Sequence, residues 1–249
     1  MRRSAVADEA QQLRTDAAAR GPGSTGRWAQ EWIKSFLIAF GLFLILRTFL
    51  VEAFRIPTGS MESTLLVGDF LLVNKAVFGA GIPFTSARTP ALAHPGRGDI
   101  VIFVPPHEPG KNYVKRLIGM PGDTVEMHAK TLFVNGLLQP EAYATHSDPA
   151  DSYSPAMFWQ CDHAPAAQPR NECRPTRDNW GPIVVPGGRY FLLGDNRDDS
   201  EDSRYWGFVA RNGLRGRPLI IYYSFDPRSR RRVPWLSSIR WDRIGNTVH

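Results

Sequence analysis

The sequence has 249 residues and only two cysteines, and that scarcity excludes two classes of protein. A disulfide-framework miniprotein needs more cysteines, and an all-cysteine structural zinc site needs four thiolates. The 22 glycines and 20 prolines together stay below the share that marks low-complexity chains, about 25–30%. With 43% hydrophobic residues, the chain is also too apolar for intrinsic disorder. A folded protein of one or two domains remains.

Long hydrophobic runs are equally scarce, because Trp32–Val51 is the single candidate for a membrane span. This excludes a polytopic transporter. As a helix, the run extends about 30 Å, the thickness of a bilayer core. Lys34 and Arg47 lie near its two ends, where long cationic side chains reach the headgroups. A buried core helix is one alternative. A cleaved signal peptide is the other, although the run starts late and is long for one.

The charges before the run predict its orientation. Residues 1–31 and the start of the run carry four acids against six basic residues, Arg2, Arg3, Arg14, Arg20, Arg27 and Lys34. By the positive-inside rule, residues 1–31 form a cytoplasmic tail and 32–51 a single-pass anchor. The rule places everything after residue 51 on the far side of the membrane.

Short β-like runs dominate the exported part. They are rich in β-branched or aromatic residues and are closed by Gly, Pro, Asn or Asp: DFLLVNKAVF, DIVIFVP, NYVKRLIG, TLFVNG, RYFLLGD and PLIIYYSF. We therefore predict a mainly β fold, in which one transmembrane helix precedes an exported β-sheet or barrel-like domain. Its core is expected from residues 52–137 and 185–249. Between them, 138–184 is predicted to be an inserted, loop-rich subdomain, because strand signals thin out there.

Two segments carry a candidate nucleophile and a candidate base. In the first, a Pro-Thr-Gly-Ser turn presents Ser60 with little side-chain cover, since Gly59 permits close approach. In the second, Lys115 alternates with apolar neighbours in a strand. Burial there would favour the neutral amine and lower its pKa. The plain alternatives are a turn hydroxyl without a reaction and a strand-edge lysine that reaches water.

A third segment, GDNRDDSEDSRYWG at residues 194–207, fits a calcium-binding EF-hand poorly. A network of acids and arginines that fixes a rigid loop, and so aims Ser200 at another site, explains it better. The six histidines do not support a Ser-His-Asp triad, because no G-x-S-x-G elbow occurs and none lies beside Ser60. A serine nucleophile with a lysine base is a known variant.

Four segments, in order, resemble the successive boxes of the bacterial type I signal peptidases (leader peptidases), a family of Ser-Lys dyad serine proteases. They are PTGSMESTLLVGD, RGDIVIF, YVKRLIGMPGD and GDNRDDSEDSRYWG. The resemblance covers residues 51–125 and 185–225, together with the preceding anchor. It implies that Ser60 is the nucleophile and Lys115 the general base.

The same resemblance implies the other roles at the site. Thr58 would complete an oxyanion hole with the Ser60 N–H, and Ser200 would orient the lysine amine. Asp202 and Arg204 would form a charged pair that holds the last box. The family builds its S1 and S3 pockets from positions that correspond here to Phe54, Ile56, Met61, Leu65, Tyr113 and Val114.

The implied activity is removal of N-terminal signal peptides from exported preproteins, with cleavage after small residues of the Ala-x-Ala type. No metal or cofactor is expected. The expected partners are signal-peptide-bearing preproteins and membrane lipid, and not nucleic acid. The expected location is the bacterial inner (plasma) membrane, with the catalytic domain on the periplasmic or extracytoplasmic side. The alternatives are a specialised relative that processes a pilin or a conjugation protein, and an inactive anchored binding module.

Two features lie outside the boxes. Cys161 and Cys173 are expected to form a disulfide in an oxidising compartment, with free thiols as the alternative. A metal site that adds His163 has irregular spacing and weak support. The C-terminal segment is rich in arginine and tryptophan, and is compatible with an anionic lipid surface, a nucleic-acid patch or a solvated tail: Arg228, Arg230, Arg231, Arg232, Trp235, Arg240, Trp241 and Arg243.

Overall fold

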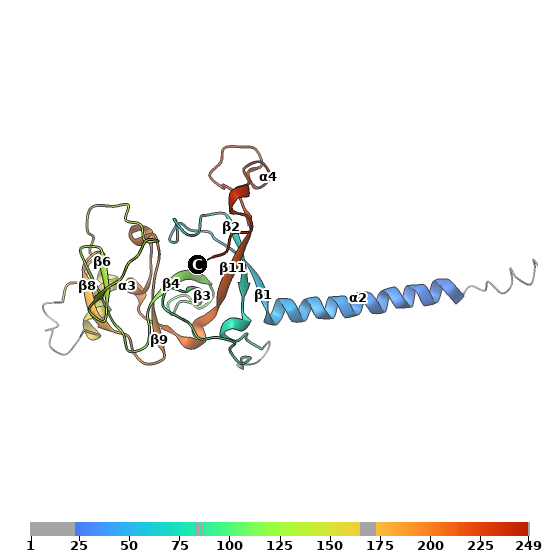
Figure 1. The fold of residues 1–249 in the computed structure, drawn as a ribbon, viewed down its shortest axis with the longest axis horizontal. Helices are drawn as coiled ribbons and strands as arrows, with labels where there is room; N and C mark the ends of the chain where they lie inside the picture. Colours follow the sequence, from blue (N-terminus) through green and yellow to red (C-terminus); the bar gives the residue numbers. More distant parts are fainter. Residues whose placement is uncertain (1–22, 83–84, 86, 165–172, 249) are drawn as a thin grey trace, which may run out of the picture. The chain divides into compact units, whose positions relative to one another are not determined.

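A computed structural model describes residues 23–82, 85, 87–164 and 173–248 (Figure 1). The chain divides between Arg47 and Thr48 into two units, which are treated separately. The first contains most of the helix α2, Gly23–Phe49. Its stretch Trp28–Phe49 has a mean hydropathy of 1.7 and is long and apolar enough to cross a membrane. None of that stretch is buried against other described residues, which is not the pattern of a soluble core helix.

The helix ends two residues before the predicted limit of the apolar run. Val51 opens strand β1 and pairs with Asn74 of β2. A β-branched residue suits this paired, extended backbone. The apolar run therefore supplies both the end of a helix and the start of a strand.

The second unit is mainly β, as predicted, and contains a curled seven-stranded antiparallel sheet (Figure 1). The strand order is β1-β2-β11-β3-β4-β9-β10. In that order the strands are Val51–Arg55, Asp69–Asn74, Leu214–Ser224, Ile100–Phe103, Tyr113–Gly119, Arg189–Leu193 and Val209–Ala210.

A second, four-stranded sheet has the order β7-β6-β5-β8. Its strands are Leu137–Leu138, Thr131–Val134, Thr124–His128 and Trp180–Val184. Strands β5 and β6 come from the stretch predicted as core, β7 straddles its limit at residue 137, and β8 comes from the predicted insertion 138–184. The sheet is thus built across the predicted boundary at residue 138, because β5 pairs with the distant β8.

Short helices lie between the strands, and two more, α4 and η6, follow the last strand β11. They are η1 (Ala76–Phe78), η2 (Pro155–Asp162), η4 (Arg197–Asp199), α3 (Ser203–Trp206), η5 (Arg211–Gly213), α4 (Pro234–Ser237) and η6 (Trp241–Arg243). Cys161 of η2 is joined to Cys173 by a disulfide.

Strand β4 lies inside the large sheet between β3 and β9, and its sequence reflects that position. Six of its seven residues are buried. Their side chains enter three clusters: Val114 packs with β2, Leu117 with β3 and Ile118 with the second sheet. A charged residue in such a strand is surrounded by apolar groups, and this is where Lys115 lies.

Candidate active site

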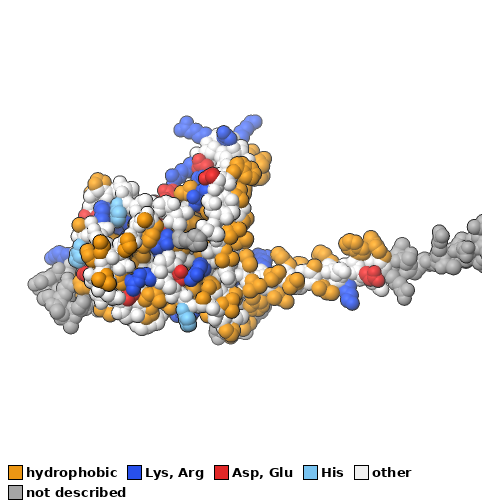
Figure 2. Space-filling model, in the orientation of Figure 1, with side chains coloured by type: hydrophobic (Ala, Val, Ile, Leu, Met, Phe, Trp, Pro, Cys, Tyr) orange, Lys and Arg blue, Asp and Glu red, His pale blue; other side chains and the backbone are white. Residues whose placement is uncertain are grey.

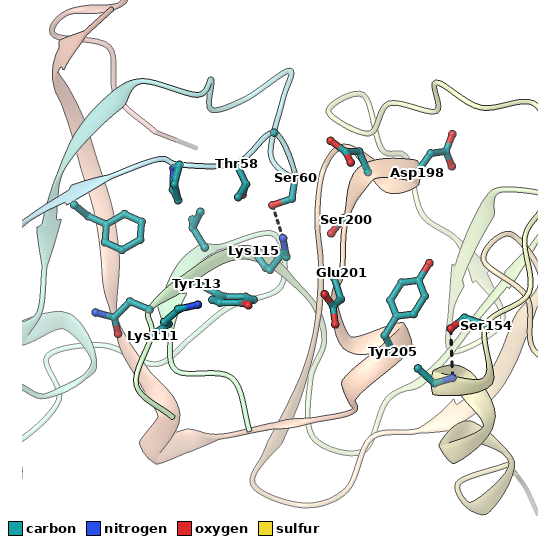
Figure 3. A pocket seen from close by; sticks show the side chains of 17 residues that line it. Thr58, Ser60, Lys111, Tyr113, Lys115, Ser154, Asp198, Ser200, Glu201 and Tyr205 are labelled. Atoms are coloured by element: carbon teal, nitrogen blue, oxygen red, sulfur yellow. Dashed lines mark hydrogen bonds between the residues drawn. The ribbon is translucent and has the colours of Figure 1, made fainter. Parts of the chain in front are cut away.

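Ser60 follows strand β1 in the turn-rich segment before β2, at the wall of a cleft of about 870 Å³ (Figure 3). The Glu62 N–H donates to the Gly59 carbonyl at 2.9 Å, and the Leu65 N–H to the Met61 carbonyl at 2.8 Å. These bonds turn the chain sharply on both sides of the serine. The Ser60 side chain is thereby fixed at the cleft, with 8% of the residue exposed.

The same turn is held from the opposite side by Asn196. Its backbone N–H donates to the Ser60 carbonyl at 3.2 Å, and its Nδ2 donates to the Gly59 carbonyl at 3.1 Å. Thr58 also lines the cleft. Within the described residues no acceptor is found for the Ser60 N–H, so this group is available to a ligand in the cleft.

Lys115 reaches Ser60 from strand β4. Its Nζ is hydrogen-bonded to Ser60 Oγ, although 55 residues separate the two in the chain (Figure 3). Only 3% of Lys115 is exposed. The two residues predicted as nucleophile and base are therefore in direct contact inside one cleft.

Burial controls the charge of this amine. Desolvation lowers the pKa of Lys115 from 10.5 to about 8, against the opposing effect of the Asp202 carboxylate. The Arg204 guanidinium acts in the same direction as burial, whereas Asp195 and Glu201 raise the pKa. A substantial fraction of the amine is therefore neutral near pH 8, and a neutral amine can accept a proton.

The acidic loop between β9 and α3 contains Asp202, whose charge acts on Lys115. Asp202 accepts hydrogen bonds from Ser200 Oγ at 2.8 Å, from the Gly194 N–H at 3.1 Å and from Arg204 Nε at 2.8 Å. Arg204 is fully buried, which by itself lowers its pKa, but the charge and hydrogen bond of Asp202 together with the charges of Tyr205 and Asp178 raise the pKa overall. The Trp159 Nε1–H and the Gln160 Nε2–H of η2 donate to the backbone carbonyl of Arg204 at 3.0 and 2.8 Å.

Ser200 lines the cleft, but its hydroxyl donates to Asp202. Among the described residues no hydrogen bond joins Ser200 to Lys115. An orienting contact between the two stays a prediction. Asp202 instead connects them electrostatically, since it binds Ser200 and acts on Lys115 through its charge.

The six residues predicted to form substrate pockets occupy two layers. Phe54, Tyr113 and Val114 line the cleft itself (Figure 3). The other three are almost fully buried in the cluster that also contains Val114: Ile56, Met61 and Leu65. The three residues of the first layer can contact a ligand directly, and the three of the second layer form part of the buried core beneath the cleft.

An ion pair that the sequence motifs did not predict joins three of them. Arg116, next to Lys115, binds Asp195 through Nε at 2.9 Å and Nη2 at 2.7 Å. Thr64 Oγ1, from the serine segment, donates to the same carboxylate at 2.5 Å. Asp195 thus ties the serine segment and β4 to the acidic loop. The sequence offers one indication of this ion pair: Arg116 directly follows Lys115, and Asp195 lies in the acidic segment 194–207.

Within the described part of the chain no cluster of three His, Cys, Asp or Glu side chains could hold a metal ion. The cleft brings together a hydroxyl, an amine of lowered pKa and a backbone N–H that has no acceptor among the described residues. Together they define a serine hydrolase whose nucleophile faces a lysine rather than a histidine.

The comparisons with known proteins agree with this class. The family described as "Signal peptidase, peptidase S26" matches residues 29–223. The signal peptidase I of Pseudomonas aeruginosa is 39% identical over 80% of this chain and 74% of its own length. That of Aquifex aeolicus is 33% identical over 78% of this chain and 84% of its own.

A solved structure of a signal peptidase I from Enterococcus faecalis is 33% identical, covering 51% of this chain and 98% of that chain, with a TM-score of 0.35. The family match and the curated relatives span most of the chain. The chain therefore belongs to the signal peptidase family, peptidase S26, and is a serine endopeptidase. The resemblance found in the four motifs is confirmed.

Proposed function

We propose that this chain removes signal peptides from exported preproteins, with Ser60 as nucleophile and Lys115 as general base. The observation that carries the proposal is the hydrogen bond between Lys115 Nζ and Ser60 Oγ. It lies in a cleft where burial brings the pKa of the amine to about 8. Removal of signal peptides is the activity of the family to which the chain belongs.

The reaction consumes one water molecule. Neutral Lys115 takes the Ser60 proton as Oγ attacks the scissile carbonyl, and the resulting ammonium protonates the leaving amine. Water then gives a proton to Lys115 and adds to the ester carbonyl; Ser60 Oγ leaves and takes that proton back from the ammonium, which restores the neutral amine. The Ser60 N–H and the Thr58 hydroxyl stabilise the oxyanion, an effect of roughly 3–4 kcal/mol per donor in comparable enzymes.

The apolar side of the cleft selects the residues before the cleaved bond. Phe54, Tyr113 and Val114 line it beside Ser60. Their bulk, backed by the buried cluster, leaves room for small side chains and favours cleavage after an Ala-x-Ala sequence.

We also propose the topology. The relatives are membrane-anchored and the chain has an N-terminal apolar helix. The basic residues that precede the helix favour a cytoplasmic N-terminus. The active site is then on the extracytoplasmic side of the inner (plasma) membrane, where preproteins emerge.

Replacement of Ser60 by alanine tests the function. Purified full chain in detergent micelles is incubated with a preprotein that carries an Ala-x-Ala site. We expect one cleavage after that site by the parent and none by Ser60→Ala. The control is Ser152→Ala, which removes an exposed hydroxyl elsewhere. Cleavage that survives Ser60→Ala would refute the assignment.

The pH dependence of kcat/KM reports the protonation state of Lys115. Because the neutral amine is the active form, activity should rise with pH and level off above a midpoint near 8. Glu201 raises the pKa of Lys115, so Glu201→Gln should move the curve to lower pH. Asp242→Asn, which removes a distant exposed carboxylate, should leave it in place. A shift to higher pH with Glu201→Gln would contradict the base assignment.

A further inference from the structure

The two sides of the cleft differ in charge, and the contact between Ser60 and Lys115 lies between them. Tyr113 belongs to the apolar side, whereas Glu201 and Tyr205 lie across the cleft (Figure 3). A substrate whose small residues occupy the apolar side brings its scissile carbonyl to Ser60. An extended chain then continues to the opposite side. The first residues after the cleaved bond therefore meet the wall that contains Glu201.

The acidic loop turns alternate side chains towards this space. The backbones of Ser200 and Asp202 are extended, and neighbouring side chains of an extended chain point in opposite directions. Ser200 and Asp202 are buried, whereas Asp199 and Glu201 are exposed. Both exposed residues line the cleft. Their carboxylates thus lie where a substrate would displace water.

The carboxylates of this wall differ in their partners. Asp198 is neutralised within the fold, because it contacts Lys130 at 3.2 Å and Arg177 at 3.1 Å. Within the described part of the chain no Lys, Arg or His side chain forms an ion pair with Asp199 or Glu201. Two negative charges of the wall are therefore open to a ligand.

The charge of Glu201 reaches both sides of the cleft. Burial lowers the pKa of Lys115 to about 8, and Glu201 is one of the carboxylates that oppose this effect. Across the cleft, burial and Glu108 raise the pKa of Tyr113 to about 12, and Glu201 acts in the same direction. Glu201 is thus within electrostatic reach of the bond to be cleaved.

The protein as a whole does not attract a basic ligand. Its net charge is +6, and on the face that Figure 2 shows, Lys and Arg side chains are more prominent than Asp and Glu. A preference for a cation at the cleft would therefore arise from this wall and not from the overall charge.

We propose that Glu201, assisted by Asp199, selects preproteins that carry a basic residue at the first or second position after the cleaved bond. A lysine or arginine side chain there meets an opposite charge that has no partner to give up. A glutamate or aspartate is repelled. The inference rests on the proposed function, because the bond that Ser60 attacks defines which residues reach Glu201.

Four peptides that span one Ala-x-Ala site test this selection with the full chain in detergent micelles. They carry lysine or glutamate at the first or the second position after the cleaved bond and are otherwise identical. At one of these positions at least, we expect kcat/KM of the parent to be about ten-fold higher for lysine than for glutamate. The preference should weaken at high ionic strength, because salt screens exposed charges.

Glu201→Gln should reduce this ratio several-fold, and Glu201→Lys should invert it. Asp242→Asn is the control, since it removes an exposed carboxylate outside the cleft and should keep the ratio of the parent. A ratio of about one in the parent at both positions would overturn the proposal. So would a preference for lysine that persists in Glu201→Lys.

The pH dependence of a single turnover at saturating enzyme distinguishes a charge contact from a change of shape. A substrate lysine beside Glu201 adds a positive charge near Lys115 and favours its neutral form. The midpoint of the single-turnover rate should therefore lie at lower pH for the lysine peptide than for the glutamate peptide. The midpoint of kcat/KM, which reports the free enzyme, should be the same for both. Equal single-turnover midpoints would contradict the contact.

Binding to Ser60→Ala separates this inference from the proposed function. That variant keeps Glu201 but lacks the attacking hydroxyl, so fluorescence anisotropy gives Kd values for uncleaved peptides. Lysine should bind more tightly than glutamate, and adding Glu201→Gln should reduce the difference. If the parent cleaves no peptide while Ser60→Ala still prefers lysine, the proposed function fails and the selection stands. If cleavage occurs but neither kcat/KM nor Kd depends on the charge, the selection fails and the proposed function stands.

Discussion

Lys115→Met is expected to lower kcat/KM by about 10²–10⁴-fold while the protein stays folded. The substitution removes the amine that contacts Ser60 Oγ but keeps an unbranched side chain in the same buried space. Rates of preprotein cleavage measured well above pH 8 give the comparison, since the parent amine is then neutral. Lys111→Met is the matched control, because Lys111 also lines the cleft but is 68% exposed and pairs with Glu108. Undiminished activity in Lys115→Met would rule out the dyad.

The same variant should be more stable than the parent at neutral pH. The pKa of Lys115 is lower in the folded protein, about 8, than the ordinary 10.5. The unfolded chain therefore binds the extra proton between these values, and the stability of the parent rises with pH from about 8 to 10.5. Below pH 8 the buried charge costs about 3 kcal/mol. Thermal unfolding should show the advantage of Lys115→Met at pH 7 and its decline towards pH 10.5.

Gly194→Ala is expected to reduce kcat/KM by about 10²-fold or more, because it displaces Ser60, the proposed nucleophile. A Cβ at this position would lie 2.5 Å from the Ser60 carbonyl oxygen and 2.2 Å from Ser200 Oγ. Rotation of the Ser200 hydroxyl would still leave Ser200 Cβ at 2.6 Å, so both Ser200 and the backbone of Ser60 have to move. The loss should fall mainly on kcat, since Phe54 and Tyr113 on the substrate side are untouched.

Gly187→Ala is the control for this substitution. It lies at the other end of β9, two residues before that strand begins, and a Cβ there would meet no atom within 4 Å. Neither glycine has a positive φ, so the pair differs in space and not in backbone strain. Circular dichroism and thermal unfolding of both variants check that they fold. Normal activity in a folded Gly194→Ala would show that the Ser60 backbone tolerates the shift.

The sequence predicted the strands and the chemistry better than the boundaries. The alternation of apolar residues around Lys115 correctly indicated a buried strand, because a central strand is covered on both faces. The end of the apolar helix was misplaced at Val51. Hydrophobicity alone does not distinguish a helix end from a strand, and Val51 becomes a strand residue only through its pairing with Asn74.

The acidic loop shows the same division. Its composition pointed to an acid–arginine network, and Asp202 and Arg204 form that pair, fully buried. The sequence did not predict which group accepts a hydrogen bond from the Ser200 hydroxyl, because several carboxylates lie within a few residues of it. The steric role of Gly194 was also invisible, since it arises from Ser60, which is far away in the sequence.

From the order of residues alone follow the existence of one apolar helix, the mainly β character, the family, and the prediction that Ser60 and Lys115 act as a pair. These depend on local composition, periodicity and motifs. Only the folded chain brings Ser60 into contact with Lys115, removes water from the amine and so lowers its pKa. The reason is physical: distance and desolvation depend on which strands pair across the sheet, and that pairing is not local in the chain.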